Sequence, residues 1–173
     1  MFRRASKAGS PDGQLAVVGR DAIDVVTELR HSQFFSGFSE TQLKEMADLS
    51  VVRTYGEQEV IFNQGDPANS LHVVAAGSVA LVRQITKAIT GEKMQVTVDI
   101  VQAGQSLGWS ALVEPHGYTV SARALGKVEL IIIDSANLNL WLQGSATATL
   151  LVFKNLNTLL AQRLRRAYDT LNV

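Results

Sequence analysis

The sequence contains no cysteine, and this absence excludes several kinds of chemistry at once. Disulfides, thiolate metal sites and thiol nucleophiles all require cysteine, so none of them can operate here. An excess of charge is also lacking, since 16 Lys and Arg residues balance 16 Asp and Glu residues. Without a net basic field, the chain has no general attraction for nucleic acid or for an anionic membrane.

Long hydrophobic runs are absent as well. The longest, such as residues 130–133, are far shorter than the roughly 20 apolar residues that cross a bilayer. The first residues include Arg3, Arg4 and Lys7, but no apolar run follows them, so they do not resemble a secretory signal. We therefore expect a soluble, cytoplasmic protein without a membrane partner.

The composition is that of a globular protein, with 46% hydrophobic and 18% charged residues in a chain of 173. This length suits one domain with an adequate core. Residues 1–20 are rich in Gly, Ser, Ala and Arg and predict a flexible tail. We expect a folded domain over residues 21–145 and a long C-terminal helix over residues 146–173.

The hydrophobic pattern predicts a mainly β fold with flanking helices. One helix is expected over residues 22–30 with Asp21 as its N-cap, and a second begins with the capping-box pair Ser39 and Gln42. Short β-branched runs separated by Gly-containing turns then indicate a sandwich, barrel or jelly roll. The predicted strands are residues 51–54, 60–63, 71–75, 79–85, 95–101, 119–124 and 128–133.

The helical period returns after the last predicted strand. Ser135, Ala136 and Asn137 are expected to cap a short helix near residues 138–142, and Gly144 ends it. Residues 147–171 contain neither Gly nor Pro and predict one long helix.

Residues 107–122, LGWSALVEPHGYTVSA, are the most informative segment. Gly108 allows the backbone to approach a ligand closely, and a short helix over residues 109–113 ends before Pro115. The first amides of such a helix suit a phosphate. Residues 109–122 nevertheless contain no Lys or Arg. A ligand here would be held by backbone amides, hydroxyls and aromatic rings.

Residues 60–79, VIFNQGDPANSLHVVAAGSV, resemble the cyclic-nucleotide-binding domain family. The similarity consists of an apolar strand, the Gly65-Asp66 turn, a small-Asn pair, a second apolar strand and a Gly-x-Val turn at the family's spacing. The similarity extends over roughly residues 30–171. The chain resembles a catabolite-activator-like sensor domain without the DNA-binding domain. The resemblance implies a double-stranded β jelly-roll barrel with N-terminal helices and a long C-terminal helix, and a nucleotide pocket formed by the cassette after Gly104.

The resemblance also implies a Glu that binds the ribose and an Arg that neutralises the cyclic phosphate. Here Trp109 stands in the position of the Glu and Tyr118 in the position of the Arg. We therefore expect a degenerate cassette that binds cAMP or cGMP weakly, or that binds another small ligand. The candidate ligand-binding residues are Gly108, Trp109, Ser110, Ala111, Tyr118 and Thr119.

Two of these residues have alternative interpretations. Trp109 either stacks on a flat ligand or fills and plugs the pocket, and we favour the plug. Tyr118 either donates its hydroxyl to an anion or caps an aromatic cluster. His116 is expected at an exposed loop tip, and His31 and His72 are isolated in the sequence. We expect no metal site and, since no catalytic motif is found, no enzyme activity.

The long helix predicts a homodimer. Six of its residues have the a/d spacing of a coiled-coil seam, although a helix packed only on its own domain is the alternative. Arg163, Arg165 and Arg166 lie near the end of this helix. The family resemblance implies that residues 166–168 line the pocket from above, but we favour a solvated helix face. The candidate interface residues are Phe153, Asn157, Leu160, Leu164, Ala167 and Leu171.

These features predict a non-catalytic regulatory or sensory module whose altered helix angle a protein partner can recognise. A structural dimerisation scaffold with a plugged pocket and a small jelly-roll enzyme are the alternatives. Only Asn172 and Val173 follow Leu171, so we expect no recognition helix and no direct DNA binding.

Overall fold

The structure is a computed structural model that describes residues 23–171, with side chains as far as residue 169. The predicted tail over residues 1–20 and the predicted N-cap Asp21 lie outside the described residues.

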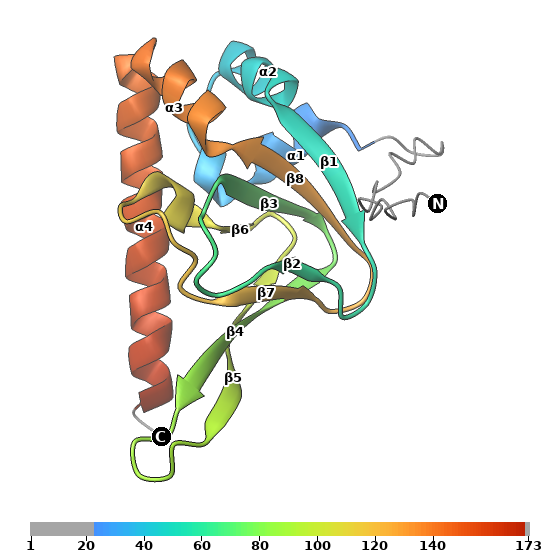
Figure 1. Ribbon diagram of the computed structural model, residues 1–173. Helices are drawn as coiled ribbons and strands as arrows, with labels where there is room; N and C mark the ends of the chain where they lie inside the picture. The colour runs from blue at the N-terminus through green and yellow to red at the C-terminus, as the bar shows by residue number, and fades with distance from the viewer. Residues whose placement is uncertain (1–22, 172–173) are drawn as a thin grey trace, which may run out of the picture.

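Two four-stranded antiparallel sheets form the body of the molecule (Figure 1). Their strand orders are β1-β8-β3-β6 and β2-β7-β4-β5. This arrangement confirms the predicted β jelly roll with helices before and after it. The strands are β1 (Ser50–Tyr55), β2 (Val60–Phe62), β3 (Ser70–Ala76), β4 (Ser78–Thr86), β5 (Lys93–Gln102), β6 (Ser106–Leu107), β7 (Ser121–Ala124) and β8 (Val128–Asp134).

Strands β3 and β8 pair with each other and are buried on both faces. On the inner face, Val74 and Leu130 pack between the two sheets. On the outer face, Val73 and Ile131 pack under the helices. Because neighbouring residues of a strand point to opposite faces, one continuous apolar run supplies both cores.

The N-terminal helices begin at side-chain caps. Helix α1 (Val25–His31) starts after Asp24, whose carboxylate accepts a hydrogen bond from the Thr27 amide, so the predicted start at residue 22 is wrong. The 3-10 helix η1 (Gln33–Phe35) follows. Helix α2 (Glu40–Asp48) has the predicted capping box, with both the Ser39 and Gln42 bonds formed.

The C-terminal helices α3 (Ser135–Gln143) and α4 (Ala146–Leu171) include the predicted segments. The N-cap of α3 is Asp134, which accepts from the Asn137 amide at 2.9 Å, so the capping predicted for residues 135–137 is wrong. Gly144 is its C-cap, as expected. Helix α4 runs along one side of the whole molecule (Figure 1). None of the helices described here is both long and apolar enough to cross a membrane.

Helix α4 is held against the β roll by apolar and polar contacts. Val152 and Leu156 are buried in the core beneath the helices. The Asn155 side-chain amide donates to the carbonyls of Phe34 and Ser36 at 2.8 and 2.9 Å. These contacts fix the N-terminal half of α4 and thereby position its C-terminal half beside β5.

We expect Leu130→Ala to lower the free energy of unfolding by about 2–5 kcal/mol, because it opens a cavity between the two sheets. Leu130 is completely buried. Urea denaturation would measure the loss. Leu125→Ala, at a position that is 42% exposed just after β7, is the control and should cost about 1 kcal/mol or less. Equal losses in the two variants would contradict this account of the core.

Candidate functional site

Gly108 brings the predicted cassette directly against β3. It is the N-cap of the 3-10 helix η2 (Trp109–Leu112) and has a φ of 79°. A Cβ atom added here would lie 2.7 Å from the Ser70 carbonyl oxygen and 2.8 Å from Nδ1 of His72. Only glycine suits both this backbone conformation and this close approach.

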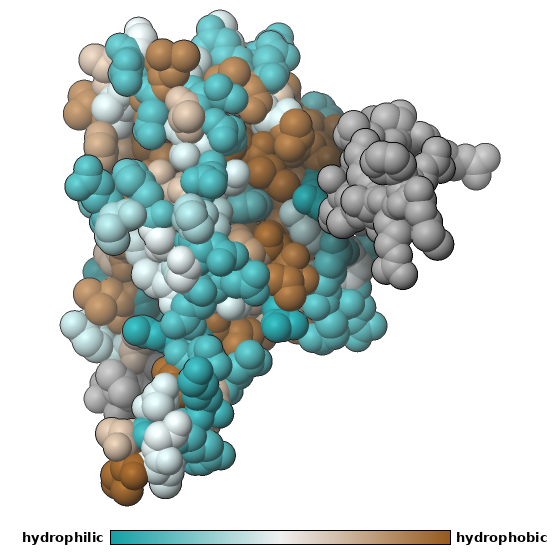
Figure 2. Space-filling model, in the orientation of Figure 1, coloured by the Kyte–Doolittle hydropathy of each residue, from teal (hydrophilic) through white to brown (hydrophobic). Residues whose placement is uncertain are grey.

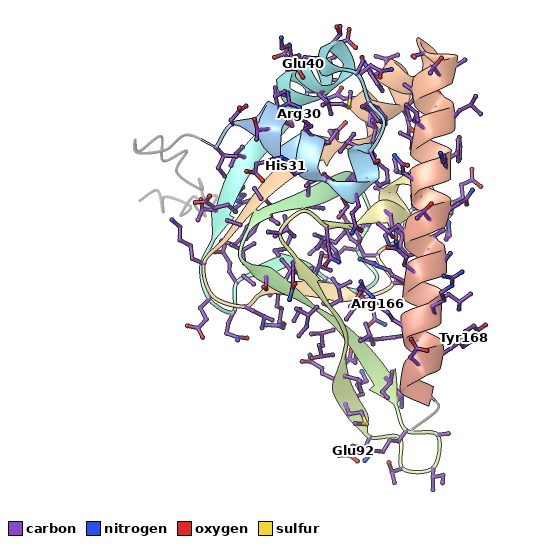
Figure 3. The ribbon with its side chains drawn as sticks, turned by 180° about the vertical axis from the view of Figure 1, so that it is seen from behind. Arg30, His31, Glu40, Glu92, Arg166 and Tyr168 are labelled. Carbon is purple, nitrogen blue, oxygen red and sulfur yellow. The ribbon has the colours of Figure 1, made fainter. Side chains whose placement is uncertain are left out.

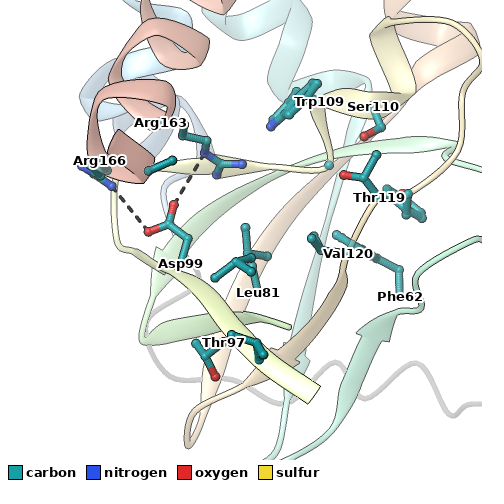
Figure 4. Close-up of a pocket in the computed structure, with 15 residues that line it drawn as sticks. Phe62, Leu81, Thr97, Asp99, Trp109, Ser110, Thr119, Val120, Arg163 and Arg166 are labelled. Carbon is teal, nitrogen blue, oxygen red and sulfur yellow. Dashed lines mark ion pairs between the residues drawn. The ribbon is translucent and has the colours of Figure 1, made fainter. Parts of the chain in front are cut away.

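A cavity of about 720 Å³ lies between the β roll and α4 (Figure 4). Its volume is typical of a small-molecule site. Apolar side chains dominate its wall, with a few hydroxyls and three charged groups. The lining residues are Phe62, Leu81, Val96, Thr97, Val98, Asp99, Gly108, Trp109, Ser110, Tyr118, Thr119, Val120, Arg163, Arg166 and Ala167.

Five of the six candidate ligand-binding residues line this cavity. They are Gly108, Trp109, Ser110, Tyr118 and Thr119. The sixth, Ala111, is 1% exposed and packs in the core between the sheets. The tight 3-10 turn places Ala111 inside the protein while its neighbours face the cavity, and this orientation was not evident from the sequence.

Trp109 does not plug the cavity. Its ring is half-buried and packs against the core beneath the helices, so that it forms part of the wall. The favoured interpretation from the sequence, in which Trp109 fills the pocket, therefore does not fit this structure. A wall position leaves one edge of the ring available to a ligand.

Tyr118 is part of an internal aromatic cluster. Its ring stacks on Phe62 with a centroid separation of 3.8 Å and an interplanar angle of 10°. Its hydroxyl donates to the Ser70 carbonyl at 3.2 Å. Burial raises the pKa of Tyr118, which keeps the hydroxyl neutral. Because the backbone already accepts this hydrogen, the geometry favours the aromatic cap over an anion donor.

A bulge in β5 turns consecutive residues of this strand toward the cavity. The register with β4 shifts so that Leu81 pairs with Asp99 and Val82 pairs with Thr97, which leaves Val98 as the extra residue. In a regular strand, neighbours would point to opposite faces. The bulge breaks this alternation and brings Thr97, Val98 and Asp99 to the same wall.

The positive charge of the cavity comes from α4. Arg163 and Arg166 flank the Asp99 carboxylate, with nitrogen–oxygen distances of 3.7 and 3.6 Å (Figure 4). Arg163 also donates to the Ser106 carbonyl at 3.0 Å. Burial lowers the pKa of Arg163, while Asp99 opposes this shift. Figure 3 shows Arg166 directed from α4 toward the β roll.

The sequence offered Arg166 as a candidate for the pocket wall but favoured a solvated face, and the lining residues Arg163 and Asp99 were not predicted. One signal was available, because Asp99 is the only acidic residue in the apolar run of residues 94–101. The bulge that turns Asp99 inward has no comparable signature in the sequence. Arg123, in contrast, lies on β7 and is not one of the lining residues that the structure describes.

His72 lies beside the cassette instead of being isolated. It is 5% exposed on the inner face of β3, with its ring 5.5 Å from that of Phe62. Burial lowers its pKa to about 4. Nδ1 has no hydrogen-bond partner. His116, as expected, is at an exposed position in the loop after η2. Within the described part of the chain, no three His, Asp or Glu residues are grouped to hold a metal.

The predicted dimer seam is partly exposed on the outer face of α4. Phe153 and Leu164 are 56% and 53% exposed, and Asn157 is exposed beside them. Leu160 is half-buried against the core, and Ala167 faces the cavity. The side chain of Leu171 lies outside the described residues. The structure thus divides the five predicted residues whose side chains it describes between two faces.

Other apolar residues extend this outer face. Leu150 and Tyr168 are 72% and 56% exposed. Tyr168 points away from the β roll in Figure 3, and hydrophobic side chains are visible over α4 at the left edge of Figure 2. Helix α4 therefore has an inner face that contacts the domain and an outer face with a largely apolar stripe that is exposed among the described residues. We define the outer stripe as Leu150, Phe153, Asn157, Leu164 and Tyr168.

Comparison with known proteins identifies a family and several relatives. The family model of the cyclic nucleotide-binding domain matches residues 52–144. The cGMP-dependent protein kinase egl-4 of Caenorhabditis briggsae is 28% identical over 147 residues, a match that covers 76% of this chain and 19% of the kinase. The chain thus spans about a fifth of the length of this curated relative.

Solved structures of bacterial proteins have the same fold. A Geobacter metallireducens protein assigned to the cyclic nucleotide-binding proteins is 26% identical, with a TM-score of 0.68 over 83% of this chain and 99% of that chain. The catabolite activator protein of Thermus thermophilus is 27% identical, with a TM-score of 0.64 over 82% of this chain and 62% of that chain.

We expect His72 to make the protein less stable in acid. Its pKa of about 4 in the folded protein lies below the ordinary histidine value of 6.5, so the unfolded chain binds the proton more readily between these pH values. The contribution of neutral His72 to the free energy of unfolding is complete above pH 6.5. It is lost as the pH falls toward 4, by up to about 3 kcal/mol. Urea denaturation at pH 7 and pH 4.5 should show a smaller loss in His72→Gln than in the wild type. Identical losses would rule out this role.

Proposed function

This chain belongs to the cyclic nucleotide-binding domain family, and we propose that it is a non-catalytic regulatory module in which a pocket ligand acts on α4. The observation that carries this proposal is the composition of the cavity wall. Arg163, Arg166 and Ala167 of α4 line the same cavity as Trp109 and Tyr118 of the β roll. A ligand in the cavity therefore contacts both the roll and the helix.

Contact with both elements provides a route from binding to regulation. Only a ligand that binds two arrangements of α4 with different affinities can shift the balance between them. The N-terminal half of α4 is held by Asn155 and the apolar core, whereas the C-terminal half contacts the roll through the Asp99 ion pairs and the Arg163–Ser106 hydrogen bond. A ligand beside Asp99 acts on the less firmly held half, which is where a change of helix angle can arise.

Cyclic nucleotides are expected to bind weakly. Neither Trp109 nor Tyr118 can replace the carboxylate and guanidinium that the family resemblance implies at these positions. A hydrogen bond to a charged group contributes about 1.5–3 kcal/mol, which corresponds to roughly 10- to 150-fold in affinity. Because both charged contacts are missing, the cavity can accommodate cAMP or cGMP by shape but offers neither charged hydrogen bond at these two positions.

We also propose that the chain forms a homodimer through the outer stripe. The residues of this stripe recur at intervals of three, four and seven along α4, which is the spacing of a coiled-coil seam. The inner face of the helix is already used by the domain, through Val152, Leu156 and Arg163. A second copy of the helix is the partner whose pattern matches the stripe, and it would carry a change in helix angle from one protomer to the other.

Restoring the cassette should restore cyclic-nucleotide binding. In the double variant Trp109→Glu, Tyr118→Arg, we expect the affinity for cAMP to rise at least tenfold over the wild type, because two charged hydrogen bonds become available. Isothermal titration calorimetry measures the affinity. Hydrogen exchange should then show altered protection in residues 159–169 when cAMP is bound.

Tyr118→Phe is the control for this experiment, because it removes the hydroxyl without adding a charge and should leave the weak cAMP affinity unchanged. Circular dichroism verifies that each variant is folded. If the restored protein binds cAMP without any change of exchange in α4, the proposed regulatory role is contradicted. If the folded double variant gains no affinity, the cassette interpretation is wrong.

Leu164→Glu should dissociate the homodimer, because it places a charge in the apolar stripe. Sedimentation equilibrium is expected to give a dimer for the wild type and a monomer for the variant. Thr158→Glu adds the same charge at an exposed position outside the stripe and should remain dimeric. A monomeric wild type, or a dimeric Leu164→Glu protein, would exclude this interface.

A further inference from the structure

The cavity has two polar ends separated by an apolar middle (Figure 4). Asp99, Arg163 and Arg166 form the end beside α4. Ser110 and Thr119, which carry hydroxyls, lie at the other end. Between the two ends lie the apolar side chains of Leu81, Trp109 and Val120, and Val96, Thr97 and Val98 of β5 also line the cavity.

This polarity is the reverse of the one that the family resemblance implies. There, a cation in the cassette would bind the anionic group of the ligand. Here, the cassette end is neutral, and both cations project from α4. Among the described residues that line the cavity, the charged groups are one carboxylate and two guanidinium groups, which leaves one uncompensated positive charge. A monoanion bound at this end would neutralise the group.

We propose that the cavity binds a flat, largely apolar carboxylate, with its carboxylate directed at Arg163 and Arg166 and a neutral hydrogen-bonding group directed at Ser110 and Thr119. This proposal rests on the proposed regulatory function and specifies the ligand class. Asp99 already places a carboxylate between the two arginines, so a ligand carboxylate fits the same guanidinium groups. The flat body fits beside the Trp109 ring in the apolar middle.

The apolar middle also disfavours a ribose phosphate. Sugar hydroxyls and phosphate oxygens beside Leu81 and Val120 would lose their hydrogen bonds to water without replacement. Such unpaired polar groups are costly to bury. An aromatic or aliphatic body loses nothing in the same place and gains from leaving water.

Binding of the carboxylate would act on α4 directly. The incoming anion competes with Asp99 for the arginines and repels the Asp99 carboxylate. Arg163 is additionally held by the Ser106 carbonyl, whereas the Arg166 side chain is 54% exposed and its guanidinium group pairs with Asp99. Arg166 is therefore the group that can turn from Asp99 to the ligand and draw α4 with it.

The test compares two probes of nearly the same shape, one anionic and one neutral. Calorimetric titration of the 173-residue chain with 2-naphthoate and with 2-naphthamide should give an affinity at least tenfold higher for the carboxylate, because only the carboxylate gains a charged hydrogen bond. Equal affinities, or tighter binding of the amide, would overturn the proposal. Absence of binding by both probes would overturn it as well.

Three variants locate the charge. Arg166→Gln should lower the 2-naphthoate affinity about tenfold and leave 2-naphthamide unchanged. Asp99→Asn removes the competing carboxylate and should raise the 2-naphthoate affinity. Arg165→Gln removes the same charge from an exposed position of α4 outside the cavity wall and is the matched control. An unchanged 2-naphthoate affinity in Arg166→Gln would assign any binding to another site.

The ligand class and the regulatory role can fail separately. If the carboxylate is not preferred but the cassette-restored protein still alters exchange in α4 on binding cAMP, only the ligand class is wrong. If 2-naphthoate binds as expected in the wild type but exchange in α4 does not change, the carboxylate site stands and the regulatory role fails. Thermal melting of each variant verifies that altered affinity does not reflect unfolding.

Discussion

Burial of β3 and β8 on both faces is the constraint on which the rest of this structure depends. The inner faces hold the two sheets together and support Gly108 against Ser70 and His72. The outer faces supply the apolar surface to which the helices bind, including the N-terminal half of α4. If either face were polar, the cassette or the helix would lose its support. The cavity exists because both elements are held by the same pair of strands.

The location of charge is the property that separates this chain from the pattern that its family resemblance implies. The short cassette retains its glycine and its tight turn, but its charged positions are occupied by Trp109 and Tyr118. One ring lines the cavity wall and the other stacks on Phe62. Positive charge enters instead from Arg163 and Arg166, on the helix that we propose to transmit the signal. Recognition of the ligand and movement of the helix would then depend on the same side chains.

Errors in the sequence-based predictions have identifiable physical causes. Seven of the eight strands were predictable because short β-branched runs and glycine turns alternate, whereas the two-residue strand β6 was missed. The Ser39–Gln42 capping box depends only on local spacing. Both incorrect helix starts have the same cause. The true N-caps are Asp24 and Asp134, and the local sequence did not distinguish these residues from other capping residues nearby. Ala111 was misplaced because a 3-10 turn and an α-helical turn direct their side chains differently.

By itself, the sequence determined the order of the main helices and strands, the β class, the glycine at position 108 and the absence of Lys and Arg from residues 109–122, because these follow from residue type and local periodicity. Tertiary structure alone decided that the cavity is open, that His72 lies beside the cassette, and that Asp99 meets two arginines more than 60 residues away in the chain. A β-bulge and the path of a long helix set these juxtapositions. Both depend on contacts between distant segments, for which local spacing has no signature.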